Sequence, residues 1–133
     1  MVPPTPLSPR GARKPVVLAV DDHPVARAVL EAVLRSEGCE VRLASGGPEA
    51  VAVYRREHAA IDLVLLAVRM RGLDGPATLE ALRQIDPAVR CCFMTVATTG
   101  DDQEARRLLG LGVEAVIPKP YRLEVIRNLI SQL

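Results

Sequence analysis

Charged and polar side chains follow three apolar runs of this sequence, at the points where short strands would end. Asp21 and Asp22 come after the run VVLAV, Thr95 ends the run CCFMT, and Lys119 lies two residues beyond the run VEAVI. Paired carboxylates bind a divalent cation such as Mg²⁺, while an ammonium and a hydroxyl neutralise and hydrogen-bond phosphate oxygens. These residue types therefore predict a site for a divalent cation and a phosphoryl group.

The third apolar run ends without a reactive side chain. LVLL (63–66) is followed by Ala67, then by a basic, glycine-containing loop, although an α/β protein usually displays its reacting group at such a strand end. Asp62 begins this strand, about 16 Å away at roughly 3.3 Å per residue, and Asp74 is expected to be a turn residue beside the next helix. Neither is a credible nucleophile, and an alanine methyl cannot form an acyl phosphate.

Short apolar runs alternate with segments of helical periodicity, which predicts a chain of five strand–helix units. Four runs are almost continuously apolar, as expected for strands buried on both faces of a parallel sheet, and the second run alternates like an edge strand. The predicted strands are residues 16–20, 40–44, 63–66, 91–95 and 113–117.

Proline marks the starts of three predicted helices, at Pro24, Pro48 and Pro76, because it is favoured in a first helical turn. A shorter helix is expected after the sequence GDD, and residues 123–133 repeat leucine and isoleucine at helical spacing. Short connections and right-handed crossovers then predict an α/β fold, a doubly wound (βα)₅ three-layer sandwich. With the strand order 2-1-3-4-5, the first and third strands end side by side, where such sheets bind ligands.

Length and composition are typical of one globular domain. The chain has 133 residues, of which 49% are apolar and 25% charged, enough to bury a core. Its net charge of +1 and aromatic content of 2% argue against a nucleic-acid or membrane partner. We expect the proline-rich residues 1–15 to be a disordered tail and residues 16–133 to form the domain.

The cysteines and the apolar runs indicate a cellular compartment. Cys39, Cys91 and Cys92 lack metal-binding spacing and are expected to be reduced thiols in the core. No apolar run reaches the length needed to span a membrane, and the N-terminus has no signal-peptide pattern. We therefore expect a cytoplasmic protein.

From Val16 to Leu133 the chain resembles a response-regulator receiver domain, the CheY-like phosphoacceptor module of two-component signalling. The resemblance rests on the acidic pair in AVDDHP, the loop DLVLL-x-VRM-x-GLDG, the threonine after CCFM, and the segment PKPY. These motifs occur in order at the expected strand ends. The resemblance implies a flavodoxin-like sheet with the strand order 2-1-3-4-5.

The resemblance also implies a role for each matching position. The two acids and a backbone carbonyl of the following loop would coordinate Mg²⁺. A hydroxyl and an ammonium would form the phosphate pocket, and the bond after the lysine would be cis. The phosphoacceptor aspartate of the family has its counterpart in Ala67. The other implied positions are, in that order, Asp21 and Asp22, Arg69, Thr95 and Lys119, and the Lys119–Pro120 bond.

Three further positions depart from the family pattern. Arg71 stands where the family often has proline, Val96 where it favours alanine or glycine, and Val116 at the switch position, where tyrosine or phenylalanine is usual. Tyr121 lies beyond the lysine and does not simply replace that aromatic residue. Together with Ala67, these departures favour a degenerate receiver over a single engineered change.

Two interpretations of the remaining pocket stay open. In one, Asp21, Asp22 and Lys119 form an ion network with no ligand, since the ammonium offsets the charge of the paired acids. In the other, the acid pair still binds Mg²⁺, weakened by at least the roughly 10–100-fold seen for outer-shell changes. His23, which precedes Pro24, is expected to be a helix-entry residue rather than a catalytic base.

The sequence therefore predicts a stand-alone pseudo-receiver that cannot accept phosphate at Ala67, is not an enzyme, and acts through protein–protein interaction. Expected partners are a histidine kinase, other receivers or output proteins. Arg106 and Arg107 lie where a homodimer or a partner could dock, on the face of the fourth helix, fifth strand and fifth helix. Two alternatives are an ordinary receiver inactivated by an engineered aspartate-to-alanine change and a small metal-dependent hydrolase using Asp21 and Asp22.

Overall fold

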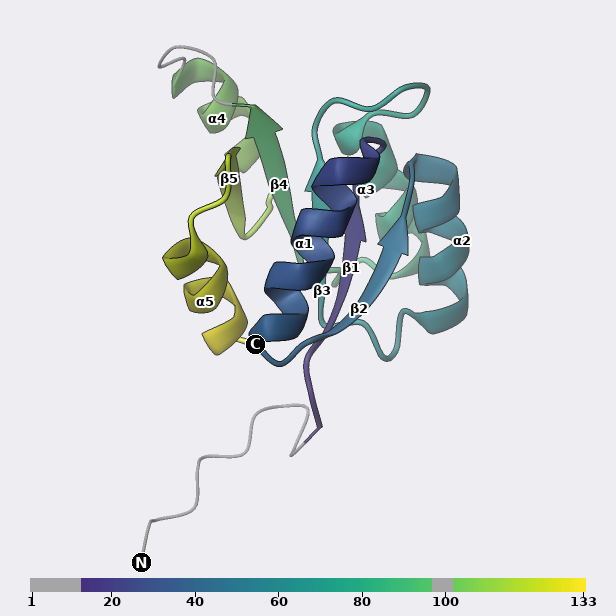
Figure 1. Cartoon of the computed structure of the whole chain (residues 1–133). Coiled ribbons are helices and arrows are strands. Elements are labelled where there is room, and N and C mark those ends of the chain that lie inside the picture. The colour runs from purple at the N-terminus through teal and green to yellow at the C-terminus, as the bar shows by residue number, and fades with distance from the viewer. Residues whose placement is uncertain (1–12, 97–101) are drawn as a thin grey trace, which may run out of the picture.

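A computed structural model describes residues 13–96 and 102–133 (Figure 1). These residues form one parallel sheet in the strand order β2-β1-β3-β4-β5, with a helix after each strand. The strands are β1 (Val16–Val20), β2 (Glu40–Ala44), β3 (Leu63–Ala67), β4 (Cys91–Val96) and β5 (Ala115–Lys119). The helices are α1 (Pro24–Ser36), α2 (Gly47–Glu57), α3 (Gly75–Ile85), α4 (Asp102–Leu109) and α5 (Leu123–Ser131).

Two apolar cores lie on the two faces of the sheet, so the fold has three layers. On one face α1 and α5 pack against the strands, and on the other face α2, α3 and α4 do so. Alternate residues of a strand serve alternate cores: in β1, Val17 and Ala19 face α1 and α5, whereas Leu18 and Val20 face the opposite side. The predicted doubly wound (βα)₅ fold and its strand order are confirmed.

Capping residues explain where α1 and α3 begin. His23 caps α1, because its Nδ1 accepts a hydrogen bond from the backbone N of Ala26 at 3.4 Å, and Pro24 follows as the first helical residue. Asp74 caps α3, with its Oδ1 accepting from the backbone N of Ala77 at 2.9 Å. Such caps satisfy N–H groups that a first helical turn leaves without partners. Both residues thus have the structural roles that the sequence predicts.

β5 differs from the prediction in both position and burial. The apolar run predicts a strand over residues 113–117, but β5 begins and ends two residues later. It includes Pro118, which an edge strand tolerates because its outer side needs no N–H donor. Ile117 alone is fully buried in this strand, so the expected burial on both faces is wrong here. The shift makes Lys119 the last residue of β5, opposite Val96 of β4.

The predicted tail over residues 1–15 falls largely outside the described residues, which begin at Arg13. Arg13 forms an ion pair with Asp62, with 3.3 Å between Nη1 and Oδ2. The same carboxylate accepts a hydrogen bond from the backbone N of Val16 at 2.8 Å. Asp62 therefore fastens the chain entering β1 to the start of β3.

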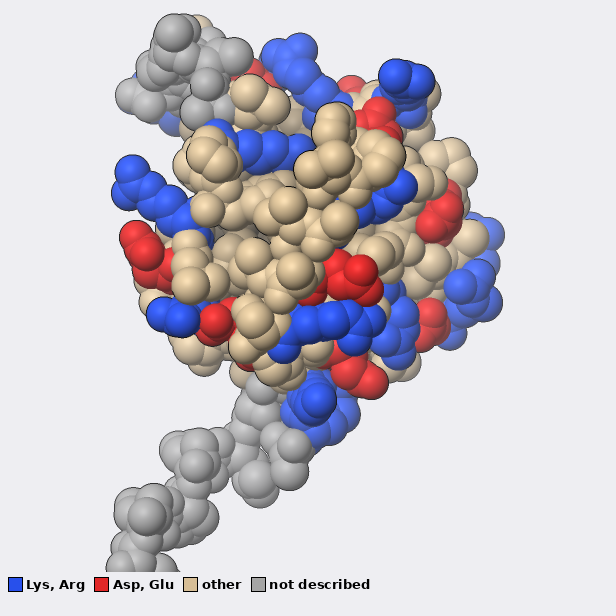
Figure 2. Space-filling model, in the orientation of Figure 1, with Lys and Arg blue, Asp and Glu red and all other residues tan. Residues whose placement is uncertain are grey.

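The cysteines and the surface charges agree with what the composition predicts. The three cysteines are buried, reduced thiols, as predicted. Within the described parts of the chain, no helix is both long and apolar enough to cross a bilayer. On the face shown in Figure 2, basic and acidic side chains are interspersed rather than separated by sign.

Candidate functional site

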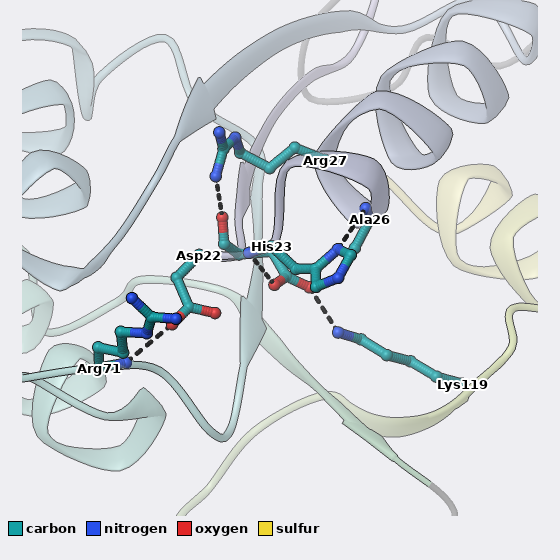
Figure 3. A network of polar contacts seen from close by, with 7 residues as sticks. Asp22, His23, Ala26, Arg27, Arg71 and Lys119 are labelled. Atoms are coloured by element: carbon teal, nitrogen blue, oxygen red, sulfur yellow. Dashed lines mark hydrogen bonds and ion pairs between the residues drawn. The ribbon is translucent and has the colours of Figure 1, made fainter.

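A buried ion pair joins the ends of β1 and β5. Asp21 directly follows β1 and is only 1% exposed. Its Oδ2 lies 2.5 Å from Nζ of Lys119, and its Oδ1 accepts a hydrogen bond from the backbone N of His23 at 3.0 Å (Figure 3). Both carboxylate oxygens of Asp21 are therefore occupied by donors from this chain.

The second acid of the pair holds the loop that follows β3. Oδ2 of Asp22 accepts a hydrogen bond from the backbone N of Arg71 at 2.9 Å (Figure 3). Arg27 of α1 donates through Nη1 to the carbonyl oxygen of Asp21 at 2.7 Å. Because these contacts tie α1 and the β3–α3 loop to the end of β1, the acid pair acts as a structural clamp.

A small cavity lies at the end of β3, where Ala67 is the last strand residue. Its volume is about 20 Å³, room for about one water molecule. Both residues predicted for the phosphate pocket, Thr95 and Lys119, line the same cavity as Ala67. The lining residues are Ala67, Val68, Arg69, Met94, Thr95, Val96 and Lys119. The fold thus gathers Ala67, Thr95 and Lys119 at one edge of the sheet, as the sequence predicts.

The rim of this cavity is bulky and basic. Val96 ends β4 and is 60% exposed. The Arg69 side chain is 80% exposed and lies 3.9 Å from the carboxylate of Glu104 in α4. Oγ1 of Thr95 lies 3.5 Å from the carbonyl oxygen of Val96, which is too long for a strong hydrogen bond. The threonine hydroxyl is thus only weakly held in this arrangement.

Val116 and Tyr121 serve opposite faces of the sheet. Val116 packs against the core under α2, α3 and α4, whereas Tyr121 packs against the core under α1 and α5. Burial, and then the nearby charge of Asp21, raise the pKa of the Tyr121 hydroxyl, which has no hydrogen-bond partner among the described residues. The intervening Lys119–Pro120 peptide bond is cis. Tyr121 therefore does not fill the place of an aromatic residue at position 116.

The two other acids near β3 do not reach the cavity. Asp62 precedes β3 at its opposite end, where it pairs with Arg13. Asp74 caps α3 and lines a separate surface groove between α3 and Leu111. Neither carboxylate lines the cavity beside Ala67.

The resemblance implies Mg²⁺ held by Asp21, Asp22 and the backbone carbonyl of Arg69. As they lie here, these residues do not fit that ion, because donors occupy both oxygens of Asp21 and a methyl group stands in place of a third carboxylate at Ala67. Mg²⁺ demands a near-octahedral set of oxygen ligands. Across residues 13–96 and 102–133, no three His, Cys, Asp or Glu side chains gather where they could hold a metal ion.

Sequence reasoning did not find the contacts of Arg27 and Glu104. Arg27 donates to the backbone carbonyl of Asp21. Because every residue has a backbone carbonyl, the residue types do not indicate which one Arg27 will contact. Glu104 of α4 lies 35 residues beyond Arg69 along the chain, and the fold brings their side chains to 3.9 Å. Both contacts depend on tertiary packing rather than on residue spacing.

Solved structures with a similar fold include receiver proteins. A response regulator receiver domain from Clostridium thermocellum has a TM-score of 0.81 at 23% identity, over 89% of this chain and 92% of that one. A chain of the CheX–CheY–BeF₃–Mg²⁺ complex from Borrelia burgdorferi has a TM-score of 0.82 at 26% identity, over 95% and 94%. The fold is therefore CheY-like.

Sequence comparisons agree. The model of the response regulator receiver domain matches residues 17–131. Two-component response regulator ARR22 of Arabidopsis thaliana is 32% identical over 118 residues, which are 88% of this chain and 82% of that protein. Sensor histidine kinase RcsC of Escherichia coli K12 is 30% identical over 116 residues, so this chain spans only 12% of the kinase's length. The chain belongs to the response regulator receiver domain family of two-component signalling.

Proposed function

We propose that this receiver domain accepts no phosphoryl group at position 67 and acts by binding other proteins of a two-component pathway. The observation that carries the proposal is the chemistry at the end of β3. Ala67 is 2% exposed and presents a methyl group to the cavity that Thr95 and Lys119 also line. A methyl carbon has no lone pair to attack phosphorus, so no acyl phosphate forms there.

The acids around Ala67 support the proposal. Asp21 is held by Lys119, and one oxygen of Asp22 is held by the backbone N of Arg71, so both acids have structural roles in this pocket. The same contacts, together with the missing carboxylate at position 67, oppose the binding of Mg²⁺. The same contacts speak against a metal-dependent hydrolase built on this pair, and receiver domains are typically signalling modules rather than enzymes.

Receiver domains bind histidine kinases and other proteins, and one solved neighbour is a CheX–CheY complex. The proposed docking surface of this chain is the face of α4, β5 and α5. Its exposed residues include the apolar Leu109 and Leu123, at 47% and 41%, and the basic Arg106 and Arg107. A mixed apolar and basic surface suits a protein partner with an apolar centre and an acidic rim. A second copy of the chain is the alternative occupant of this face.

The proposed setting is the cytoplasm, because the cysteines are buried and free of disulfide bonds.

Intact mass spectrometry tests the missing chemistry. The chain as written and its Ala67→Asp variant are incubated with Mg²⁺ and a small phosphodonor such as acetyl phosphate. We expect no adduct on the unaltered chain, because the acyl acceptor is absent. One phosphoryl group on Ala67→Asp would show that position 67 alone blocks the reaction.

An Ala67→Asn variant provides the matched control, since it restores the size and polarity of the side chain without its nucleophilic oxygen. It should stay unmodified. Unfolding curves for each variant establish that all are folded. A phosphoryl group on the unaltered chain would contradict the proposal, and peptide mapping of that adduct would identify the acceptor.

A further inference from the structure

Among the described residues, Lys119 is the one charged side chain that contacts the carboxylate of the buried acid, Asp21. Asp21 and Asp22 carry two negative charges side by side, and the Lys119 ammonium supplies one positive charge directly against Asp21. We infer that Lys119 is the resident cation of this pocket: its ammonium takes the electrostatic place of a divalent ion and keeps Mg²⁺ out. The inference rests on the proposed function, since it concerns the pocket left by the missing phosphoacceptor.

The geometry places the ammonium in competition with a metal ion for the carboxylate of Asp21. A metal bound by Asp21 needs a carboxylate oxygen, yet Oδ2 contacts Lys119 and Oδ1 contacts the backbone N of His23. The Lys119 side chain is 22% exposed and that of Asp21 is 2% exposed, so water screens this pair poorly. A divalent ion placed on Asp21 would therefore meet a like charge at close range.

The methyl group of Ala67 lets this pairing form. In the sheet, β3 and β4 lie between β1 and β5, so Lys119 must reach past the ends of both strands to contact Asp21. Ala67 and Lys119 line the same cavity, so an acid at position 67 would compete with Asp21 for the ammonium. With alanine there, position 67 offers no carboxylate, and Lys119 pairs with Asp21.

This arrangement predicts an unusual response to mutation. Removing the lysine charge should create a Mg²⁺ site, because it frees an oxygen of Asp21 and leaves the acid pair uncompensated. Thermal unfolding is measured with and without Mg²⁺, using NaCl to match the ionic strength. The melting temperature of the unaltered chain should be the same within about 1 °C in both. Lys119→Gln should melt roughly 10 °C lower without metal and regain several degrees in Mg²⁺ through linked binding.

Two further variants separate this effect from a general loss of charge. Arg127→Gln removes an ion pair of similar length, 3.0 Å to Glu37 on the outside of α5, and its melting temperature should not respond to Mg²⁺. Asp21→Asn/Lys119→Gln removes both charges of the pocket pair. It should melt above Lys119→Gln and lose the response to Mg²⁺.

A rise in the melting temperature of the unaltered chain with Mg²⁺ would overturn the inference, as would a Lys119→Gln variant that ignores the ion. If Lys119→Gln does not fold at all, the double variant decides: restored folding supports charge compensation by Lys119, and continued failure contradicts it. The proposed function fails separately, through a phosphoryl adduct on the unaltered chain. A Mg²⁺ response without such an adduct would therefore remove only this inference.

Discussion

A single methyl group at position 67 changes the electrostatics of the pocket as well as its reactivity. An aspartate there would add a third negative charge beside Asp21 and Asp22, whereas alanine leaves two acids that Lys119 and a backbone N–H can satisfy. The residue types at the strand ends were enough to predict this set of groups. An ion network of Asp21, Asp22 and Lys119 was one of the two interpretations that the sequence left open, and the structure contains the Asp21–Lys119 pair. Spacing along the chain could not say which of the two acids Lys119 would contact.

Cys91 and Cys92 illustrate how strongly the sheet shields its side chains. Burial raises the pKa of Cys92 to about 12 and raises that of Cys91 further, with the charge of Glu114 a smaller cause for Cys92. Since only the thiolate is nucleophilic, both thiols should resist iodoacetamide at about pH 8. We expect alkylation at least about a hundred-fold slower in the folded chain than in denaturant, measured by mass spectrometry.

An exposed thiol calibrates this measurement. Ala52 lies on the exposed face of α2, so an Ala52→Cys variant should gain one alkyl group at the rate of an unhindered cysteine. If Cys91 or Cys92 reacts as fast as that added thiol in the folded protein, β4 opens to solvent far more readily than its burial implies.

Elements were predictable where a strand is buried on both sides and less so at the edge of the sheet. β1 and β3 read directly from their continuous apolar runs, and their positions match to within one residue. β5 lies two residues beyond its apolar run, because an edge strand is set by its hydrogen bonds to β4 and tolerates Pro118. Hydrophobic periodicity indicates which side chains are buried. Few side chains are buried in an edge strand, so its bounds are harder to predict from the sequence.

The backbone at the start of α3 packs closely against the end of β3, where Ala67 lies. Gly75 donates its backbone N–H to the carbonyl of Val68 at 2.8 Å, directly after β3. A Cβ at Gly75 would lie 2.6 Å from the carbonyl oxygen of Ala67 and 2.9 Å from Cα of Val68. Both are backbone atoms that cannot move aside without shifting the strand end.

Gly75→Ala should therefore destabilise the fold by about 1–3 kcal/mol, the usual cost of overpacking. Urea unfolding followed by circular dichroism gives the change in free energy. Gly46→Ala is the matched control, because its added Cβ would meet only Pro48, at 4.0 Å, and its backbone is extended. Equal stability of the two variants would mean that α3 can retreat from β3 at no cost.

At the scale of the whole molecule, the layered fold follows from the alternation of buried strands and amphipathic helices, and two cores result. Each core contains a titratable side chain that keeps its proton to a higher pH in the folded state than in the unfolded state. Burial, and then the charge of Asp86, raise the pKa of Tyr54 from 10.0 to about 12, and Cys92 rises from 9.0 to about 12. At a pH between the unfolded and the folded pKa of each group, the unfolded chain has lost a proton that the folded chain keeps.

The sign of this linkage is fixed: above about pH 9 the unfolded state binds fewer protons, so the free energy of unfolding falls as pH rises. We expect a loss of roughly 2–4 kcal/mol between about pH 8 and about pH 10.5, measured by urea unfolding at each pH. Repeating the series at high salt removes surface repulsion, which salt screens, and leaves the buried groups. Tyr54→Phe should reduce this fall in the free energy of unfolding, because it deletes one of the titrating groups. A free energy of unfolding that stays level to about pH 10.5 would contradict the expectation. It would show that these hydroxyl and thiol groups ionise within the folded sheet.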